Sequence, residues 1–117
     1  MTNEADYLIQ EQIEYEIKSS PIVLFMRGTP TFPQCSGSSK AVNLLNIFGL
    51  KYKAIDVLTD NALHQGLKDC GNLDPIPHLY VCKKFIGNHD TLMKMIESGE
   101  FESLLLKNKI KHKPLSD

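Results

Sequence analysis

Residues 22–40 read I-V-L-F-M-R-G-T-P-T-F-P-Q-C-S-G-S-S-K, and the architecture of the chain follows from this pattern. The first five residues form an apolar, partly β-branched run between a proline and a glycine, which is typical of a short strand buried on both faces. Two prolines stiffen the loop at residues 28–34. Apolar residues then recur at helical spacing from Ala41 to the terminating Gly49. The stretch therefore predicts a strand, a stiff loop that leads to Cys35, and a helix.

The rest of the chain alternates helical and strand patterns. Further helices are predicted at residues 6–18, at 59–71 between a Thr59/Asp60 cap and Gly71, at 90–98 and at 101–107. Further strands are predicted at residues 52–58, 78–82 and 84–87, the last two forming a tight hairpin. This order is a βαβ unit followed by a helix and a hairpin. It predicts an α/β fold with a small mixed four-stranded sheet flanked by helices on both faces.

Length and charge bound the class of protein. The chain has 117 residues, which suits a single domain at 1–117 with a core at about 6–107 and a flexible tail at 108–117. A net charge of -1 argues against a nucleic-acid partner. No apolar run approaches the roughly 20 residues of a membrane helix, and the acidic N-terminus does not resemble a signal or transit peptide. We therefore expect a cytoplasmic protein, from a bacterial cytosol or, where a presequence has been removed, from an organelle matrix.

The three cysteines are Cys35, Cys70 and Cys82. Their odd number and the absence of C-x-x-C spacing argue against a disulfide framework. The four histidines form no zinc pattern with them. We interpret Cys70, at a helix end, and Cys82, at a strand end, as small packing or surface residues; a resolving role is the alternative for Cys70.

Cys35 falls where the loop after the first strand meets the next helix. Unpaired backbone N–H groups and the helix dipole favour an anion there, so the thiolate is stabilised relative to the thiol. Arg27 and Lys40 add positive potential nearby. Only the thiolate is a nucleophile or metal ligand, and we interpret Cys35 as the reactive residue. The alternatives are an inert buried cysteine, or a helix capped by Ser36 or Ser38 beside which Cys35 is incidental.

Two further elements have the chemistry of a binding site. Pro75-Ile76-Pro77 precedes a short strand, where a cis bond before proline would turn the chain and expose backbone groups. Gly87-Asn88-His89-Asp90 joins the hairpin to a helix, so its amides and the Asp90 carboxylate can bind a ligand. The alternative is that Asp90 only caps the helix.

Together with the cysteine stretch, these elements resemble the monothiol glutaredoxins, a family with the thioredoxin-like fold. The family pattern reads K-G-T-P-x-x-P-x-C-G-F-S, then W-P-T-I-P, then G-G-C-D. The matching residues here are Arg27-Gly28-Thr29-Pro30, Phe32-Pro33-Gln34-Cys35, Ser38, Ile76-Pro77, Gly87 and Asp90. The spacings agree, and the resemblance covers about residues 10–106.

The resemblance implies a groove for glutathione between Cys35 and a cis-proline at Pro77. Ile76 would pair with the cysteinyl backbone of the tripeptide. The other implied glutathione contacts are His89 and Asp90 for the γ-glutamyl end, and Arg27 and Lys68 for the glycine carboxylate.

The family commonly binds a [2Fe-2S] cluster between two protomers, held by the active cysteine of each chain and one glutathione thiol per chain. For this chain, that implies Cys35 as the metal ligand, glutathione and the [2Fe-2S] cluster as cofactors, and a homodimer when loaded. The implied partners are a BolA-like protein and iron–sulfur apo-proteins. The predicted function is glutathione-dependent binding and transfer of [2Fe-2S] clusters in iron–sulfur protein maturation and redox homeostasis.

The chemistry of the residues supports this interpretation, since Ser38 stands where a dithiol enzyme has its second cysteine. Cys35 then has no partner for a local disulfide. A [2Fe-2S] cluster takes four thiolates, so a chain that offers one must take the other three ligands from glutathione and a second subunit. One alternative is an oxidoreductase in which Cys35 attacks glutathione mixed disulfides and free glutathione resolves the adduct. Another is an interaction module with a degenerate site.

Three departures from the family pattern fall in the site and bear on cluster stability more than on the fold. Ser36-Gly37 replaces Gly-Phe, which removes an aromatic shield and loosens the first helical turn. Leu73-Asp74-Pro75 replaces Trp-Pro-Thr and brings a carboxylate toward the thiolate. Asn88-His89 replaces Gly-Cys. The His89 side chain could be a proton donor or an alternative ligand, but we favour a role for its backbone alone.

Overall fold

A computed structural model of the protein describes residues 4–69 and 75–114. Within these residues, helices and strands alternate in the predicted order. The elements are α1 (Glu4–Lys18), β1 (Ile22–Met26), α2 (Ser36–Ile47), β2 (Lys53–Asp56), the 3₁₀ helix η1 (Val57–Thr59), α3 (Asn61–Asp69), β3 (His78–Val81), β4 (Lys84–Gly87), α4 (His89–Ser98) and α5 (Glu100–Lys107).

The four strands form one mixed sheet in the order β2-β1-β3-β4. β1 pairs in parallel with β2, with Leu24 opposite Ala54, and antiparallel with β3, with Leu24 opposite Leu79. All five residues of β1 are buried, as expected for a central strand covered on both faces. The parallel β1–β2 pair is connected through α2, which confirms the predicted βαβ unit.

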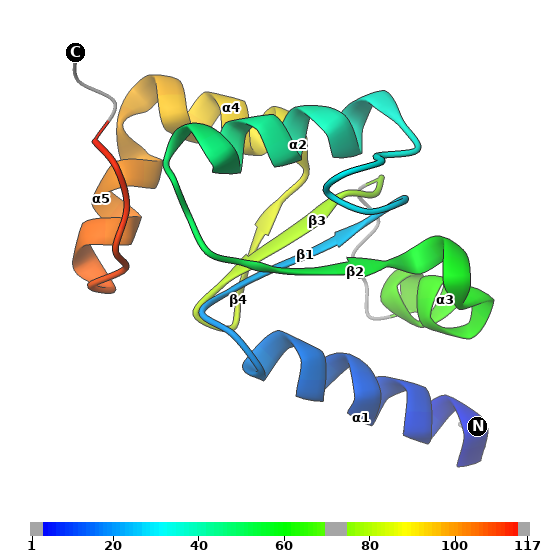
Figure 1. The fold of residues 1–117 in the computed structure, drawn as a ribbon. Coiled ribbons are helices and arrows are strands. Elements are labelled where there is room, and N and C mark those ends of the chain that lie inside the picture. The colour runs from blue at the N-terminus through cyan, green and yellow to red at the C-terminus, as the bar shows by residue number, and fades with distance from the viewer. Residues whose placement is uncertain (1–3, 70–74, 115–117) are drawn as a thin grey trace.

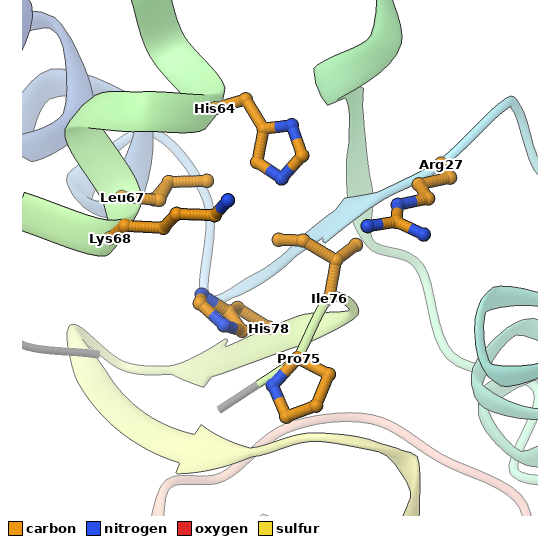
Figure 2. Close-up of a pocket in the computed structure, with 7 residues that line it drawn as sticks. All are labelled: Arg27, His64, Leu67, Lys68, Pro75, Ile76 and His78. Atoms are coloured by element: carbon orange, nitrogen blue, oxygen red, sulfur yellow. The ribbon is translucent and has the colours of Figure 1, made fainter. Parts of the chain in front are cut away.

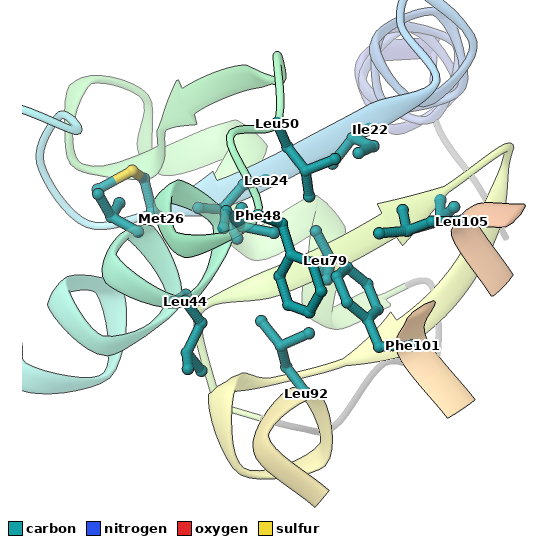
Figure 3. Close-up of a cluster of buried hydrophobic side chains, with 14 residues drawn as sticks. Ile22, Leu24, Met26, Leu44, Phe48, Leu50, Leu79, Leu92, Phe101 and Leu105 are labelled. Atoms are coloured by element: carbon teal, nitrogen blue, oxygen red, sulfur yellow. The ribbon is translucent and has the colours of Figure 1, made fainter. Parts of the chain in front are cut away.

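Helices cover both faces of the sheet, which Figure 1 shows edge-on between α1 and α3 on one side and α2, α4 and α5 on the other. On the α1–α3 side, Ile13 and Leu67 pack with Val23 and Phe25 of β1. The opposite side holds a larger apolar cluster, drawn in Figure 3, in which the rings of Phe48 and Phe101 meet edge-to-face at 5.2 Å. The predicted α/β, thioredoxin-like architecture is confirmed.

Element boundaries differ from the prediction where polar side chains bind the backbone. β2 ends at Asp56 rather than extending to 58, because the Asp56 carboxylate accepts the Leu58 N–H at 2.9 Å and starts η1. Asp60 accepts the Leu63 N–H at 3.0 Å, so the predicted cap of α3 is confirmed; the predicted end of that helix at Gly71 lies outside the described residues. The second helix begins at Ser36, which confirms the predicted position of Cys35 at a helix N-terminus.

The segment after α5 follows the body of the domain over its described part, residues 108–114. Ile110 packs against the larger apolar cluster, and its N–H donates to the Leu105 carbonyl at 2.9 Å. The Lys113 N–H donates to the Phe48 carbonyl at 2.6 Å. Among the described residues, no helix combines the length and the apolar character that crossing a bilayer requires.

Candidate functional site

Cys35 is the N-cap residue of α2. Its backbone is extended (φ -151°, ψ 159°), and its Sγ accepts the Ser38 N–H at 3.3 Å. The side chain is half-buried rather than enclosed. The thiol itself therefore caps the helix, and the alternative in which Ser36 or Ser38 is the cap is wrong. Cys35 is also not the enclosed cysteine of the second alternative, because its side chain is partly accessible; its reactivity stays a prediction.

Ser38 is fully buried and joins Cys35 to the end of β1. Its Oγ lies 3.1 Å from the Cys35 Sγ and accepts the Arg27 N–H at 3.0 Å. As a thiol, Cys35 donates to this oxygen, which has two lone pairs and so accepts from both groups; if Cys35 is deprotonated, the hydroxyl hydrogen can rotate to donate to the sulfur instead. The hydroxyl at the second-cysteine position thus contacts the Cys35 sulfur but cannot form a disulfide with it.

The loop between β1 and Cys35 is tied back on itself. The Gln34 N–H donates to the Arg27 carbonyl at 2.9 Å, and Gly28 bridges to Pro33. Gly28 has φ +86°, and its N–H donates to the Asp56 carboxylate at 2.9 Å. A side chain at Gly28 would collide with the loop backbone. The loop therefore fixes the positions of Arg27 and Cys35 relative to the sheet.

Pro77 lies against the first turn of α2. The Ile76–Pro77 peptide bond is cis, as the resemblance implies. An ideal Cβ placed on Gly37 would lie 3.2 Å from the Pro77 Cδ, so the proline ring faces the backbone two residues after Cys35. Both Ile76 and Pro77 are buried.

The His89 side chain, from the start of α4, packs against the first turn of α2, which the sequence analysis did not predict. Its Nδ1 would be 2.8 Å from a Cβ on Gly37, and no residue in the described ranges forms a hydrogen bond with that buried nitrogen. Its Nε2 lies 3.4 Å from an Asp90 carboxylate oxygen. The ring thus occupies the space that a side chain at position 37 would need; that only the His89 backbone contacts a ligand stays a prediction.

Asp90 is not the cap of α4. Asn88 takes that role, and its side-chain oxygen accepts the N–H groups of Asp90 and Thr91 at 2.9 and 3.3 Å. The Asp90 side chain is 75% exposed. Its carboxylate is thus oriented toward solvent beside His89, and the cap-only alternative is wrong.

A cavity of about 300 Å³ lies on the other side of Ile76, between α3 and the ends of β1 and β3 (Figure 2). Its lining contains no carboxylate among the described residues and is made of Arg27, His64, Leu67, Lys68, Pro75, Ile76 and His78. Figure 2 shows His64 and Lys68 pointing into it from α3, and Arg27 from the segment that follows β1. Because Arg27 also bonds Ser38 and Ile76 precedes Pro77, the cavity and the thiol share a common wall.

The cavity has the electrostatics of an anion site. Burial lowers the pKa of His64 from 6.5, and the charges of Lys68, Arg27 and His78 lower it further. The Nε of Arg27 and the Nε2 of His64 are buried with no hydrogen-bond partner in the part of the chain that is described. The sequence interpretation identified Arg27, Lys68 and Ile76 but missed both histidines. The spacing of His64 and Lys68, four residues apart on one helix face, is a signal that could have revealed the first.

The remaining cysteines do not join this site in the described structure. Cys82 is exposed in the turn between β3 and β4, with φ +48°. Cys70, Leu73 and Asp74 lie outside the described residues. Within residues 4–69 and 75–114, no group of three or more His, Cys, Asp or Glu side chains could hold a metal ion. A metal at Cys35 would therefore take its other ligands from outside this part of the chain.

Comparison with known proteins assigns the chain to a family. The sequence pattern of the glutaredoxin family matches residues 22–86. Monothiol glutaredoxin-5, mitochondrial, of Saccharomyces cerevisiae is 44% identical over 100 residues, which is 83% of this chain and 67% of that protein. The corresponding protein of Lachancea kluyveri is 43% identical over 99 residues, covering 82% of this chain and 69% of that one.

Solved structures agree with the assignment. A monomeric truncated mutant of 1-C-Grx1 from Trypanosoma brucei has a TM-score of 0.82 at 31% identity, covering 91% of this chain and 96% of that one. A buckwheat glutaredoxin, solved in complex with glutathione, shares the fold with a TM-score of 0.78 at 21% identity, covering 92% of this chain and 96% of that one. The chain therefore belongs to the glutaredoxin family and, within it, to the monothiol glutaredoxins.

Proposed function

We propose that this chain binds glutathione beside Cys35 and, as a homodimer, carries a [2Fe-2S] cluster to iron–sulfur apo-proteins, in their maturation and in redox homeostasis. The observation that carries the proposal is a lone, half-buried thiol at the start of α2, with a hydroxyl where a second thiol would allow a disulfide. The cationic cavity beyond Ile76 supplies a place for an anionic tripeptide.

Glutathione would span from the cavity to the start of α4. Its glycine carboxylate would contact Arg27 and Lys68, whose charges suit a carboxylate. Its cysteinyl backbone would pair with Ile76 next to the cis-proline, which brings its sulfur toward Cys35. The γ-glutamyl end would reach the exposed Asp90 carboxylate and the first amides of α4.

The cluster is the cargo of this site. A [2Fe-2S] cluster needs four thiolates, and within the described residues Cys35 is the thiol that lies at this position. Two chains and two glutathione thiols complete the set, so loading and dimer formation are coupled. A BolA-like protein is a second candidate partner of the loaded form. The site of action is the cytoplasm or an organelle matrix; the mitochondrial names of the yeast relatives favour the matrix.

Anaerobic reconstitution with ferrous iron, sulfide and glutathione tests the proposal. We expect visible charge-transfer absorption, one cluster per two chains, and a dimer on size-exclusion chromatography, all of which depend on glutathione. Cys35→Ser should abolish the absorption, whereas Cys82→Ser, which removes an exposed thiol in the hairpin turn, should keep it. Absence of the absorption, or its survival in Cys35→Ser, would overturn the proposal.

A second candidate function is the reduction of glutathione mixed disulfides, favoured by the Ser38 N–H, which donates to the Cys35 sulfur, and by the Ser38 hydroxyl 3.1 Å from that sulfur. The Cys35 thiolate would attack the glutathionyl sulfur and release the protein thiolate. A second glutathione thiolate would then attack the adduct on Cys35 and leave as oxidised glutathione. Turnover of a glutathionylated peptide measures this activity, and a carrier should turn over only slowly.

A further inference from the structure

His64 lies in the cationic cavity one helical turn before Lys68. Its ring points into the space between α3 and the end of β1, as Figure 2 shows, and its Nε2 is buried. No described residue forms a hydrogen bond with that nitrogen, and the same holds for the Arg27 Nε. A buried polar nitrogen without a partner is unfavourable, so both atoms are suited to a hydrogen bond with a bound ligand.

The charged groups around His64 are cationic. Arg27 faces it from the end of β1, Lys68 from α3 and His78 from β3. Two carboxylates on the adjoining segments bind the backbone: Asp60 accepts the Leu63 N–H and caps α3, and Asp56 accepts the N–H groups of Gly28 and Leu58. Among the described residues, no carboxylate lines the cavity to neutralise it.

We infer that His64 is a proton-coupled anion contact, which meets the carboxylate of a bound ligand as an imidazolium and makes binding take up a proton. With the ligand of the proposed function, on which this identity rests, the anion is the glycine carboxylate of glutathione. His64 would then be a specificity residue for an anionic end group and would link glutathione affinity to pH.

The direction of the linkage follows from the charges. In the free protein, burial and the neighbouring positive charges lower the His64 pKa, so the ring is neutral at pH 7. A carboxylate bound within hydrogen-bond distance favours the charged form and raises that pKa. Affinity therefore increases as pH falls through the interval between the bound and free pKa values, and it is flat on either side. The carboxylate of the ligand is ionised throughout, so the proton belongs to the protein.

The test follows the His64 ring by NMR while glutathione is added under anaerobic, reducing conditions at pH 5.5, 6.5 and 7.5. One proton coupled to binding changes affinity by at most about tenfold per pH unit. We expect wild-type affinity to rise about tenfold from pH 7.5 to 5.5 and to change less than about twofold in His64→Gln. The His64 ring should titrate at a higher pH with glutathione than without it.

His112→Gln is the matched control, because it removes an imidazole that packs on Phe48 and lines a different cavity. It should keep the full pH dependence. Glutathione ethyl ester, which lacks the free glycine carboxylate, should bind the wild type with no pH dependence. An unchanged pH dependence in His64→Gln would overturn the inference.

Sulfate separates failure of this inference from failure of the proposed function, since its charge is constant over this pH range. If glutathione binds at no pH, the proposed function fails. The anion contact then survives only if sulfate, compared with chloride at equal ionic strength, raises the pH at which His64 titrates. If glutathione binds with the same affinity at all three pH values, the inference alone is overturned.

Discussion

The imidazole of His89 takes the place that a side chain on Gly37 would occupy. An ideal Cβ on Gly37 would lie 2.8 Å from the His89 Nδ1 and 2.9 Å from its Cε1. The family pattern has a phenylalanine at position 37 and a cysteine at position 89. In this chain the ring is supplied instead from the start of α4, across the first turn of α2 that carries Cys35. An aromatic ring therefore lies beside position 37, although this chain lacks the phenylalanine of the family pattern.

This contact predicts that Gly37→Ala has opposite effects in two backgrounds. Alanine in a helix is normally more stable than glycine by about 0.5–1 kcal/mol. In the wild type, the new methyl group collides with His89, and we expect a net loss of about 1 kcal/mol from overpacking. In a His89→Ala background, the same substitution should stabilise the protein. Urea unfolding of the four proteins measures the coupling.

Ser36→Ala is the control for helix propensity, because Ser36 is exposed in the same turn. It should shift the free energy of unfolding by the same small amount in both backgrounds. An equal effect of Gly37→Ala with and without the histidine would contradict the contact.

The sequence predicted those parts of the fold that depend on local patterns. The apolar run of β1 and the Asp60 cap of α3 could be identified because each is specified within a few residues. The start of α2 directly after Cys35 was also predicted, but its cap was not decided, because Ser36 and Ser38 are good capping residues as well and only the structure shows that the thiol takes this role. The Gly37–His89 contact joins residues far apart in sequence, and only the tertiary structure brings them together.

Ser38→Ala should reduce both the reactivity of Cys35 and the stability of the domain. The substitution removes the hydroxyl 3.1 Å from Sγ and leaves the Arg27 N–H without its acceptor. We expect alkylation by iodoacetamide at pH 7 to slow roughly fivefold, which corresponds to about 1 kcal/mol for the lost hydrogen bond. The Arg27 N–H, left without an acceptor, should lower the free energy of unfolding by about 1–3 kcal/mol.

Ser36→Ala tests whether any serine in this turn has the same influence on the thiol. It should leave the alkylation rate within about twofold of the wild type, because lost surface contacts rarely exceed about 0.5 kcal/mol. A Ser38→Ala protein with an unchanged rate would show that the hydroxyl does not stabilise the thiolate.

His64 should make the protein less stable in mild acid. Its pKa is lowered in the folded state from 6.5, mainly by burial, so the unfolded chain binds its proton first. Stability is therefore lost as pH falls below 6.5, and the loss stops once pH drops below the folded-state pKa. The urea midpoint should fall more between pH 7.5 and 5.5 in the wild type than in His64→Gln. A parallel fall in the two proteins would contradict this assignment.

Ile110→Ala should destabilise the whole domain, although it lies after the last helix. Ile110 is partly buried against the larger apolar cluster, and its N–H is bonded to Leu105. Because full burial of an isoleucine would cost about 2–5 kcal/mol on truncation, we expect about 1–2 kcal/mol here. Lys111→Ala, at the exposed next position, should change the unfolding free energy by less than about 0.5 kcal/mol. An unchanged midpoint in Ile110→Ala would mean that residues 108–114 behave as the flexible tail that the sequence predicts.

Lys68→Gln should weaken glutathione binding through the glycine carboxylate alone. Lys68 lines the cavity beside Arg27, and a charge-assisted hydrogen bond to a carboxylate contributes more than a neutral one. Because the lysine is exposed, we expect a loss of affinity of about fivefold at low salt. The loss should be smaller in about 0.5 M salt, because salt shortens the Debye length to a few ångströms and screens the charge of Lys68. Lys107→Gln makes the same charge change on α5, where no part of the cavity lies, and should bind normally. Glutathione ethyl ester, which lacks the free glycine carboxylate, decides between the possible contacts. It should bind the wild type and Lys68→Gln with equal affinity. A fivefold difference in affinity that persists with the ester would assign Lys68 to another part of the tripeptide.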